Sequence, residues 1–521
     1  MKRTVILVTI TILMMIILLS FVTVMGDVSL AENTSDSHKP FYVGVTYCGE
    51  SVQEAKELID TVKEYTNFFV LQSVYLHWNI SVVDEICNYA MASGLYCAAF
   101  CCVSFDADNT AELAMWLNVA KERWGEQFIG IYYDDEPGRQ MLVSTVVLEQ
   151  ILTRDEFGLR FKYQLTKDSS GKIQLNDDGF YCEFFPDGQI MLLNNNRTCS
   201  ITYYPDGTLT LSDWANNNFY TSGNITKYPS QIPTYEQAME QNPVKNNDDA
   251  AKVFVNKNKF AMEDRNRLNK LQLEDSILVF TADSSLYWWD YQSNYDFVLA
   301  KLGVNNTVAQ EIGIVRGAAN LYGKSWGTLL TWKYTDPYYL ADGHEMFEQM
   351  RDSYEAGAEY VLIFNNSYNS ENPNILKDEH FQALDRFWIE VVQNPQVTHG
   401  GIKAAAVLVL PQNYGWGMHD WGMHNSDRIW GIWDTNSTTQ QIRSQMQTRL
   451  NQYGLKLDIV YDDPDYPIEN RYRNIYYWDS TESFSLFNFF TSYLGWLIAT
   501  VLLFPIIAVV LLVYFRRRKT R

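Results

Sequence analysis

Three consecutive carboxylates end an apolar run within residues 128–138. Residues 128–133 are followed by Asp134, Asp135 and Glu136, and then by a proline and a glycine. Proline cannot donate a hydrogen bond to a strand ladder and glycine permits a sharp turn, so a strand must end here. Acids held together at the mouth of a buried strand repel each other, which raises the pKa of one of them. The stretch predicts a carboxyl group that acts as a general acid near neutral pH, or more simply a solvated acidic turn.

Alternation along the strand predicts which of these side chains lie together. Successive side chains point to opposite faces of a strand. Tyr132, Asp134 and Glu136 are therefore expected on one face, and Asp135 on the other. The raised pKa, and with it a catalytic role, is therefore expected on Asp134 or Glu136.

The surrounding segments alternate between strands and helices. The expected strands are residues 41–47, 67–73, 95–102, 128–133, 276–283, 296–302, 326–333 and 360–364. Eight strands, each followed by a helix or a connecting segment, predict an α/β chain with a (β/α)₈ TIM barrel over residues 41–394. An open doubly wound sheet is the alternative, disfavoured because no glycine-rich phosphate turn follows a strand.

Two further segments have a different pattern. Residues 155–232 contain Pro-Asp-Gly twice between alternating runs, which predicts a β-meander inserted after the fourth strand. Residues 401–479 carry three expected strands and a helix, which predicts a small α/β domain after the barrel.

Both ends of the chain are apolar. Two basic residues precede an uncharged run within residues 1–31, which predicts a signal peptide or an N-terminal anchor. Residues 484–515 carry no charge and precede a basic tail at 516–521, which predicts a transmembrane helix through the lipid bilayer with a cytoplasmic tail. The middle of the chain is expected outside the cell, as a single-pass ectodomain on the cell membrane. Glycosylation sequons agree with that location; they begin at Asn33, Asn79, Asn196, Asn224, Asn305, Asn365 and Asn436.

The composition of the chain limits the classes of molecule that it is expected to bind. The chain has 62 acidic and 41 basic residues, a net charge of −21, which argues against nucleic-acid binding. Aromatic residues make up 15%, as expected for surfaces that stack on sugars. No cysteine and histidine spacing resembles a zinc site and no phosphate cradle is present, so neither a metal nor a cofactor is expected.

Residues at the ends of barrel strands are the ones expected in a site. Here they are acids, amides and aromatic residues, which suit a neutral substrate rich in hydroxyl groups. Asp283 ends the fifth strand and is the third predicted catalytic residue. The residues expected to bind substrate are Asp135, Tyr47, Gln72, Tyr132, Trp288, Trp332, Asp336 and Asn365.

With these motifs the chain resembles the barrel glycoside hydrolases. In the clan A group an Asn-Glu-Pro at the end of the fourth strand carries the acid/base glutamate, and Asp135-Glu136-Pro137 is similar with aspartate for asparagine. In the chitinase-like families the fourth strand ends in Asp-X-Glu, and Asp134-Asp-Glu136 has that spacing. The resemblance implies hydrolysis of a poly- or oligosaccharide, with Glu136 as the acid.

The second carboxylate departs from the clan A pattern. Such enzymes have a nucleophilic glutamate on strand seven, whereas residues 331–336 contain none, which leaves Asp283 or Asp336. Two-acid hydrolysis needs carboxyl groups about 5 Å apart for retention or ~6.5–9.5 Å for inversion. A substrate-assisted route on N-acetylated glycans would need only Asp134 and Glu136. The rival function is a non-catalytic glycan-binding or cell-envelope protein, which a basic side chain paired with Glu136 would favour.

Overall fold

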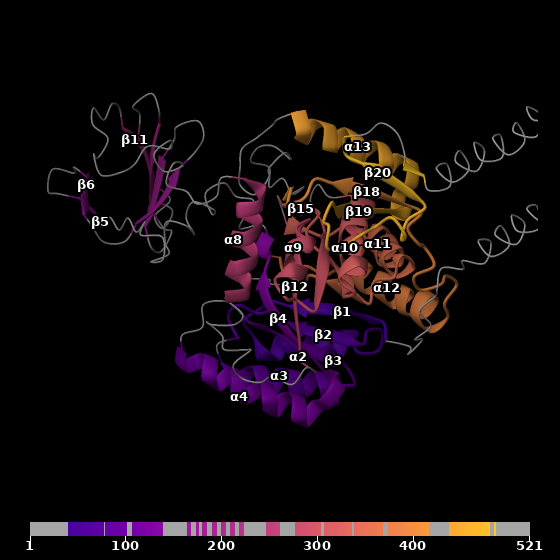
Figure 1. The fold of residues 1–521 in the computed structure, drawn as a ribbon. Coiled ribbons are helices and arrows are strands. Elements are labelled where there is room, and N and C mark those ends of the chain that lie inside the picture. The colour runs from indigo at the N-terminus through magenta and orange to yellow at the C-terminus, as the bar shows by residue number, and fades with distance from the viewer. Residues whose placement is uncertain are drawn as a thin grey trace, which may run out of the picture. The chain divides into compact units, whose positions relative to one another are not determined.

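The computed structural model describes most of the chain between residues 40 and 485. The described ranges are 40–77, 79–101, 107–138, 246–260, 277–303, 307–335, 338–367, 374–415, 437–479 and 484–485, with separate strands between 164 and 222. Figure 1 shows how their elements are arranged.

Eight parallel strands close into a barrel. Their order around it is β1 (Tyr42–Tyr47), β17 (Tyr360–Ile363), β14 (Ser325–Leu330), β13 (Phe297–Leu302), β12 (Leu278–Asp283), β4 (Phe128–Asp135), β3 (Tyr96–Cys101) and β2 (Phe68–Leu71). β1 pairs with both β2 and β17, so the sheet has no edge. The predicted (β/α)₈ barrel is confirmed, and the open sheet is wrong.

Aromatic side chains fill the barrel. The ring of Phe297 stacks on Phe280 and on Tyr360, with centroids 4.3 and 3.9 Å apart. Phe280 also stacks on Tyr132, at 5.1 Å. Because side chains alternate along a strand, every second residue of each strand points into this core. At the carboxyl end of a strand, the last residue in this alternation lies at the mouth of the barrel.

Helices surround the barrel (Figure 1). They are α2 (Val52–Val62), α3 (Ile80–Ala92), α4 (Ala107–Trp124), α8 (Asn247–Phe260), α9 (Tyr287–Gln292), α10 (Val308–Tyr322), α11 (Gly343–Ala356) and α12 (Asp378–Phe387), with short turns η1 (Gly125–Gln127) and η4 (Trp388–Gln393). Ser51, Asn79 and Asp342 begin α2, α3 and α11, each accepting a hydrogen bond from the amide three residues on. Such caps satisfy amides that the first helical turn leaves without partners.

The segment predicted as a meander contains antiparallel strands. Five of them pair in the order β11 (Asn218–Ser222), β10 (Leu209–Asp213), β9 (Cys199–Tyr203), β8 (Ile190–Asn194) and β7 (Phe180–Phe184). β5 (Gln164–Lys167) pairs with β6 (Ile173–Asn176), and farther along the chain β15 (Tyr334–Thr335) pairs with β16 (Tyr338–Tyr339).

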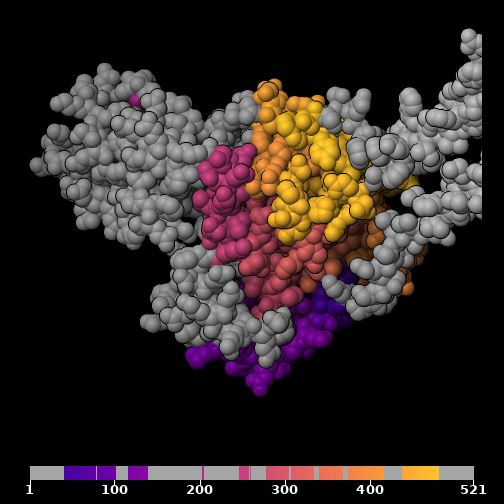
Figure 2. Space-filling model, in the orientation of Figure 1, coloured from indigo at the N-terminus to yellow at the C-terminus, as the bar shows by residue number. Residues whose placement is uncertain are grey.

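A second sheet follows the barrel in the sequence. It has the order β19 (Leu457–Tyr461), β18 (Ala406–Leu410), β20 (Asn474–Tyr477) and β21 (Phe484–Ser485), with α13 (Ser437–Tyr453) and η5 (Gly454–Lys456) between β18 and β19. β19 packs on barrel helix α10, and in Figure 2 the surface of this part, in yellow, meets that of the barrel. A Cβ atom at Gly313 or Gly317 of α10 would meet the carbonyl oxygens of Leu457 and Ile459 at 2.7 and 2.8 Å, so this approach requires glycine.

The predicted membrane segments fall largely outside the described residues. Within the described ranges, no helix is long and apolar enough to cross a bilayer. Residues 1–31, 486–515 and 516–521 are not among them, and residues 484–485, predicted to begin the span, pair instead with β20.

Candidate functional site

A bulge in β4 sets the directions of the three acids. Phe280 pairs with Tyr132, whereas Ala282 pairs with Asp135, so β4 has one residue more than β12 over this interval. Asp134 adopts a left-handed backbone with φ 55°, and its carbonyl accepts a hydrogen bond from the Thr281 hydroxyl at 2.8 Å. An extra residue reverses the alternation beyond it. The expectation that Tyr132 shares a face with Asp134 rather than with Asp135 is therefore wrong: the Tyr132 hydroxyl donates to Asp135 Oδ1 at 2.5 Å.

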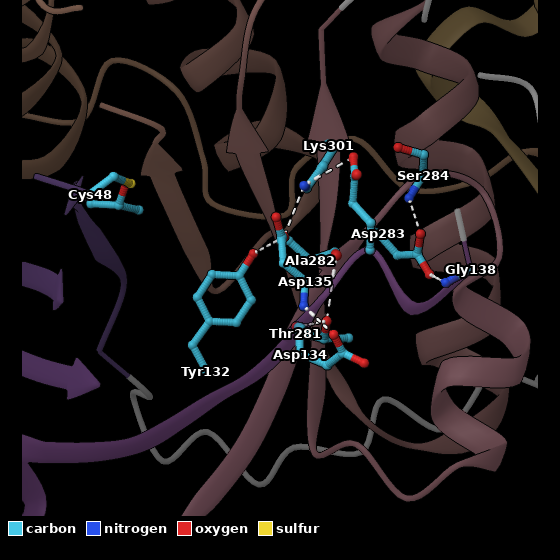
Figure 3. A network of polar contacts seen from close by, with 12 residues as sticks. Cys48, Tyr132, Asp134, Asp135, Gly138, Thr281, Ala282, Asp283, Ser284 and Lys301 are labelled. Carbon is cyan, nitrogen blue, oxygen red and sulfur yellow. Dashed lines mark hydrogen bonds and ion pairs between the residues drawn. The ribbon is translucent and has the colours of Figure 1, made fainter. Parts of the chain in front are cut away.

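Lys301 joins the other two acids at the mouth of the barrel. It lies on β13 in the same alternation as Phe297 and Leu299 of the barrel core. Its ammonium is 2.9 Å from Asp135 Oδ1 and 3.1 Å from Glu136 Oε1 (Figure 3). Burial alone lowers the pKa of Lys301, but attraction to the two carboxylates outweighs it, and the pKa lies above its ordinary value. The mouth therefore contains a triad of Asp135, Lys301 and Glu136, joined by two ion pairs.

This triad argues against Glu136 as a general acid. A general acid must hold a proton near neutral pH, whereas an ammonium 3.1 Å away stabilises the ionised carboxylate. Glu136 also adopts a left-handed backbone with φ 54°, and its amide donates to the Ala282 carbonyl at 2.9 Å. The glutamate is held in place by both its backbone and its side chain.

Asp283, the other proposed acid, is enclosed by protein. Its side chain is fully buried and accepts hydrogen bonds from the amides of Gly138 at 2.5 Å and Ser284 at 2.7 Å (Figure 3). A methyl group on Gly138 would collide with Asp283 Oδ2, so this turn requires glycine. Burial above all raises the pKa of Asp283 to about 7. Its neighbours in β12 show why it is enclosed: Ala282 belongs to the barrel core, so Asp283 points out of the barrel.

Asp290 of α9 lies beside Asp283. It is fully buried, and no donor in the described part of the chain reaches either of its carboxylate oxygens. Burial first, and then the negative charge of the Asp283 carboxylate, raise the pKa of Asp290 well above its ordinary value. The two aspartates therefore form a buried acidic pair behind the barrel wall, and the folded chain favours their protonated forms.

Three of the residues predicted to bind substrate lie at or below the mouth of the barrel. Tyr132 is fully buried in the core beneath Asp135. Gln72 is buried at the end of β2, and its Oε1 has no partner within the described residues. Trp332 is half-buried after β14, with its ring against Phe364 and its indole nitrogen donating to the Asn366 carbonyl.

Two residues predicted to bind substrate, Tyr47 and Trp288, have structural contacts instead. The Tyr47 hydroxyl donates to the Ser51 carbonyl at the start of α2. Trp288 is buried against Tyr461 and Tyr466 of the C-terminal sheet region.

The side chain of Asn365 is hydrogen-bonded within the loop after β17. Its amide group donates to Asn374 Oδ1, and its oxygen accepts from the Ile375 and Leu376 amides. Because it is also 1% exposed, the sequon at Asn365 cannot carry a glycan in the folded chain. Asp336 and its predicted role lie outside the described residues.

Lys301 is the site residue that sequence reasoning missed. A single lysine inside an otherwise apolar strand was the available signal, since burying it requires a paired charge. Cys48 lies near the same triad as a buried free thiol, and burial raises its pKa to about 12, so the thiolate is suppressed. Among the described residues, no group of three or more histidine, cysteine or acidic side chains is arranged to hold a metal ion.

Comparisons with known proteins return only distant likenesses. No family model and no curated protein matches the chain. Solved structures similar to it include a GH5_18 protein from Streptomyces cattleya in complex with Manb1-4GlcNAc, at 9% identity and TM-score 0.41, covering 84% of this chain and 99% of that one.

Two more structures are similar at lower scores. A glycoside hydrolase family 5 enzyme from Prevotella bryantii, in complex with a xyloglucan tetradecasaccharide, has 8% identity and TM-score 0.27, covering 67% of this chain and 96% of that one. The enoyl reductase domain of MlnA from Bacillus amyloliquefaciens has 7% identity and TM-score 0.24, covering 62% and 53%. The assignment as a (β/α)₈ barrel stands on the strand order of the chain itself.

Proposed function

We propose that this protein binds a poly- or oligosaccharide at the carboxyl-terminal mouth of its barrel without hydrolysing it by the two-acid route. The observation that carries the proposal is the Asp135–Lys301–Glu136 triad. It places fixed polar groups at the position where (β/α)₈ barrels bind ligands. Such groups, together with the half-buried ring of Trp332 after β14, suit the hydroxyl groups and apolar faces of sugars.

The same contacts weigh against two-acid hydrolysis. Lys301 stabilises the ionised form of Glu136, so this carboxyl is a poor proton donor. Asp283 has a raised pKa, as an acid would need, but it is fully buried outside the barrel lumen. Neither carboxyl therefore combines a proton at neutral pH with access to a ligand in the mouth.

The test uses the full chain and a panel of soluble oligosaccharides. Binding is measured by titration calorimetry, and cleavage by mass spectrometry of the same mixtures. We expect wild-type protein to bind at least one sugar and to leave it intact. Absence of binding to every sugar would contradict the proposal.

A second candidate is a hydrolase in which Glu136 acts as an ionised base or nucleophile. The left-handed backbones of Asp134 and Glu136 favour it, because strained conformations of non-glycine residues cluster at active sites. Cleavage that disappears in Glu136→Gln and persists in Asp385→Asn, a change at an exposed acid of α12, would establish this candidate and reject the first.

The location outside the cell is also a proposal, supported by the apolar runs within residues 1–31 and 484–515 and the basic tail at 516–521. We expect the chain to stay with membranes after alkaline carbonate extraction and its barrel to be digested by protease added to intact cells. Removing residues 486–521 is expected to release it. Recovery of the full-length chain in the soluble fraction would contradict the C-terminal anchor.

A further inference from the structure

The barrel mouth presents negative charge outward and keeps its positive charge inside. The Lys301 side chain is 8% exposed, whereas that of Asp135 is 32% exposed. Two carboxylates and one ammonium leave the triad with a net charge of −1. A ligand that enters the mouth therefore meets the Asp135 carboxylate before the ammonium.

Asp135 retains an acceptor atom that the described part of the chain does not use. The Tyr132 hydroxyl and the Lys301 ammonium both bind its Oδ1. Neither of these two contacts uses Oδ2, so one oxygen of this partly exposed carboxylate is left for a ligand.

Gln72 supplies a second unused acceptor at the same rim. Its side chain is 5% exposed, and no donor among the described residues reaches its Oε1. Phe68 and Val70 of β2 point into the barrel core, so alternation directs Gln72 into the mouth. A buried amide oxygen without a donor is satisfied when a ligand hydroxyl or ammonium donates to it.

We propose that the mouth selects amino sugars, meaning glycans that carry free ammonium groups. The inference rests on the proposed sugar binding and names its ligand class. The ammonium donates to Asp135 Oδ2 in a charge-assisted hydrogen bond, and neighbouring donors of the sugar reach Gln72 Oε1. An N-acetylated sugar offers a neutral amide instead, and an acidic sugar is repelled by the triad. The net charge of −21 also favours the approach of cationic ligands over anionic ones.

The experiment compares three probes on the full chain: hexamers of glucosamine, of N-acetylglucosamine and of galacturonic acid. Titrations run near physiological ionic strength, where attraction between distant surface charges is screened. We expect glucosamine hexamer to bind roughly 10- to 100-fold more tightly than the N-acetylated hexamer, the range of one charge-assisted hydrogen bond. Galacturonic acid hexamer is expected to bind most weakly.

Matched variants separate the contact from general attraction between a polycation and an acidic protein. Asp135→Asn is expected to abolish the preference for glucosamine hexamer, so that the two hexamers bind with similar affinity. Asp385→Asn removes the same charge from an exposed position on α12 and is expected to change neither. If both variants weaken glucosamine binding equally, the inference is wrong.

The outcomes also separate this inference from the function on which it rests. Equal affinity of wild-type protein for the glucosamine and N-acetylglucosamine hexamers, or preference for galacturonic acid, rejects amino-sugar selection and leaves sugar binding intact. Failure to bind any sugar of the wider panel rejects both. The comparison of the three hexamers on wild-type protein requires no variant, so it tests amino-sugar selection even if Asp135→Asn does not fold.

Discussion

Replacing Arg316 with methionine is expected to lower the free energy of unfolding by about 3–5 kcal/mol, the range for breaking a buried ion pair. Arg316 lies on α10 and is 4% exposed. Its Nε donates to Asp458 Oδ1 at 2.7 Å, and its Nη2 donates to the Leu455 and Leu457 carbonyls. Methionine fills the space but leaves the fully buried Asp458 carboxylate, whose other donor among the described residues is the Tyr472 hydroxyl at 2.8 Å. Chemical denaturation of the two proteins measures the difference.

The control is Arg471→Met. Arg471 also reaches α10, through the Asn320 carbonyl at 2.9 Å, but it is exposed, so the loss is expected to stay under about 1 kcal/mol. Adding Asp458→Leu to Arg316→Met is expected to restore part of the stability, because the buried charge is then gone. Equal losses in the two arginine variants would show that this ion pair does not fasten the C-terminal sheet to the barrel.

Replacing Asp290 with asparagine is expected to raise the free energy of unfolding at pH 8. In the wild type, burial raises the pKa of Asp283 from 3.8 to about 7 and that of Asp290 well above its ordinary value. The folded pair thus holds protons that the unfolded chain releases. Its stabilisation is complete below pH 3.8 and is lost as pH rises through about 7.

Asparagine cannot ionise, so the folded variant does not have to keep a proton at this position. Each unit by which the pKa of Asp290 is raised corresponds to about 1.4 kcal/mol, so the gain is expected at pH 8 and is expected to vanish near pH 4. Urea unfolding at both pH values measures it, with Asp385→Asn as the exposed control. Some pH dependence is expected to persist, because burial also raises the pKa of Glu311 to about 7. A variant whose stability depends on pH as strongly as that of the wild type would show that the protonation of Asp290 does not limit the stability at pH 8.

The local sequence pattern was sufficient to predict the strands of the barrel. Strands buried on both faces of a parallel sheet form continuous apolar runs, and all eight such runs form strands within a few residues of their predicted limits. The strands β8 and β10 likewise follow the two Pro-Asp-Gly sequences, as the local pattern predicted. The acids at the end of β4 were located in the same way, since Pro137 and Gly138 mark where the strand must end.

What those acids do was decided by contacts distant in the sequence. Thr281, 147 residues from Asp134, fixes the bulge that reverses their directions. The ammonium that pairs with Glu136 comes from Lys301, on a strand two places around the barrel. Strand periodicity contains no information about the register of a neighbouring strand or about which side chain faces it across the mouth. The pattern of residues therefore gave the position of the carboxylates, and only the closed barrel gave their partners, because hydrogen bonds and ion pairs depend on distances that folding alone creates.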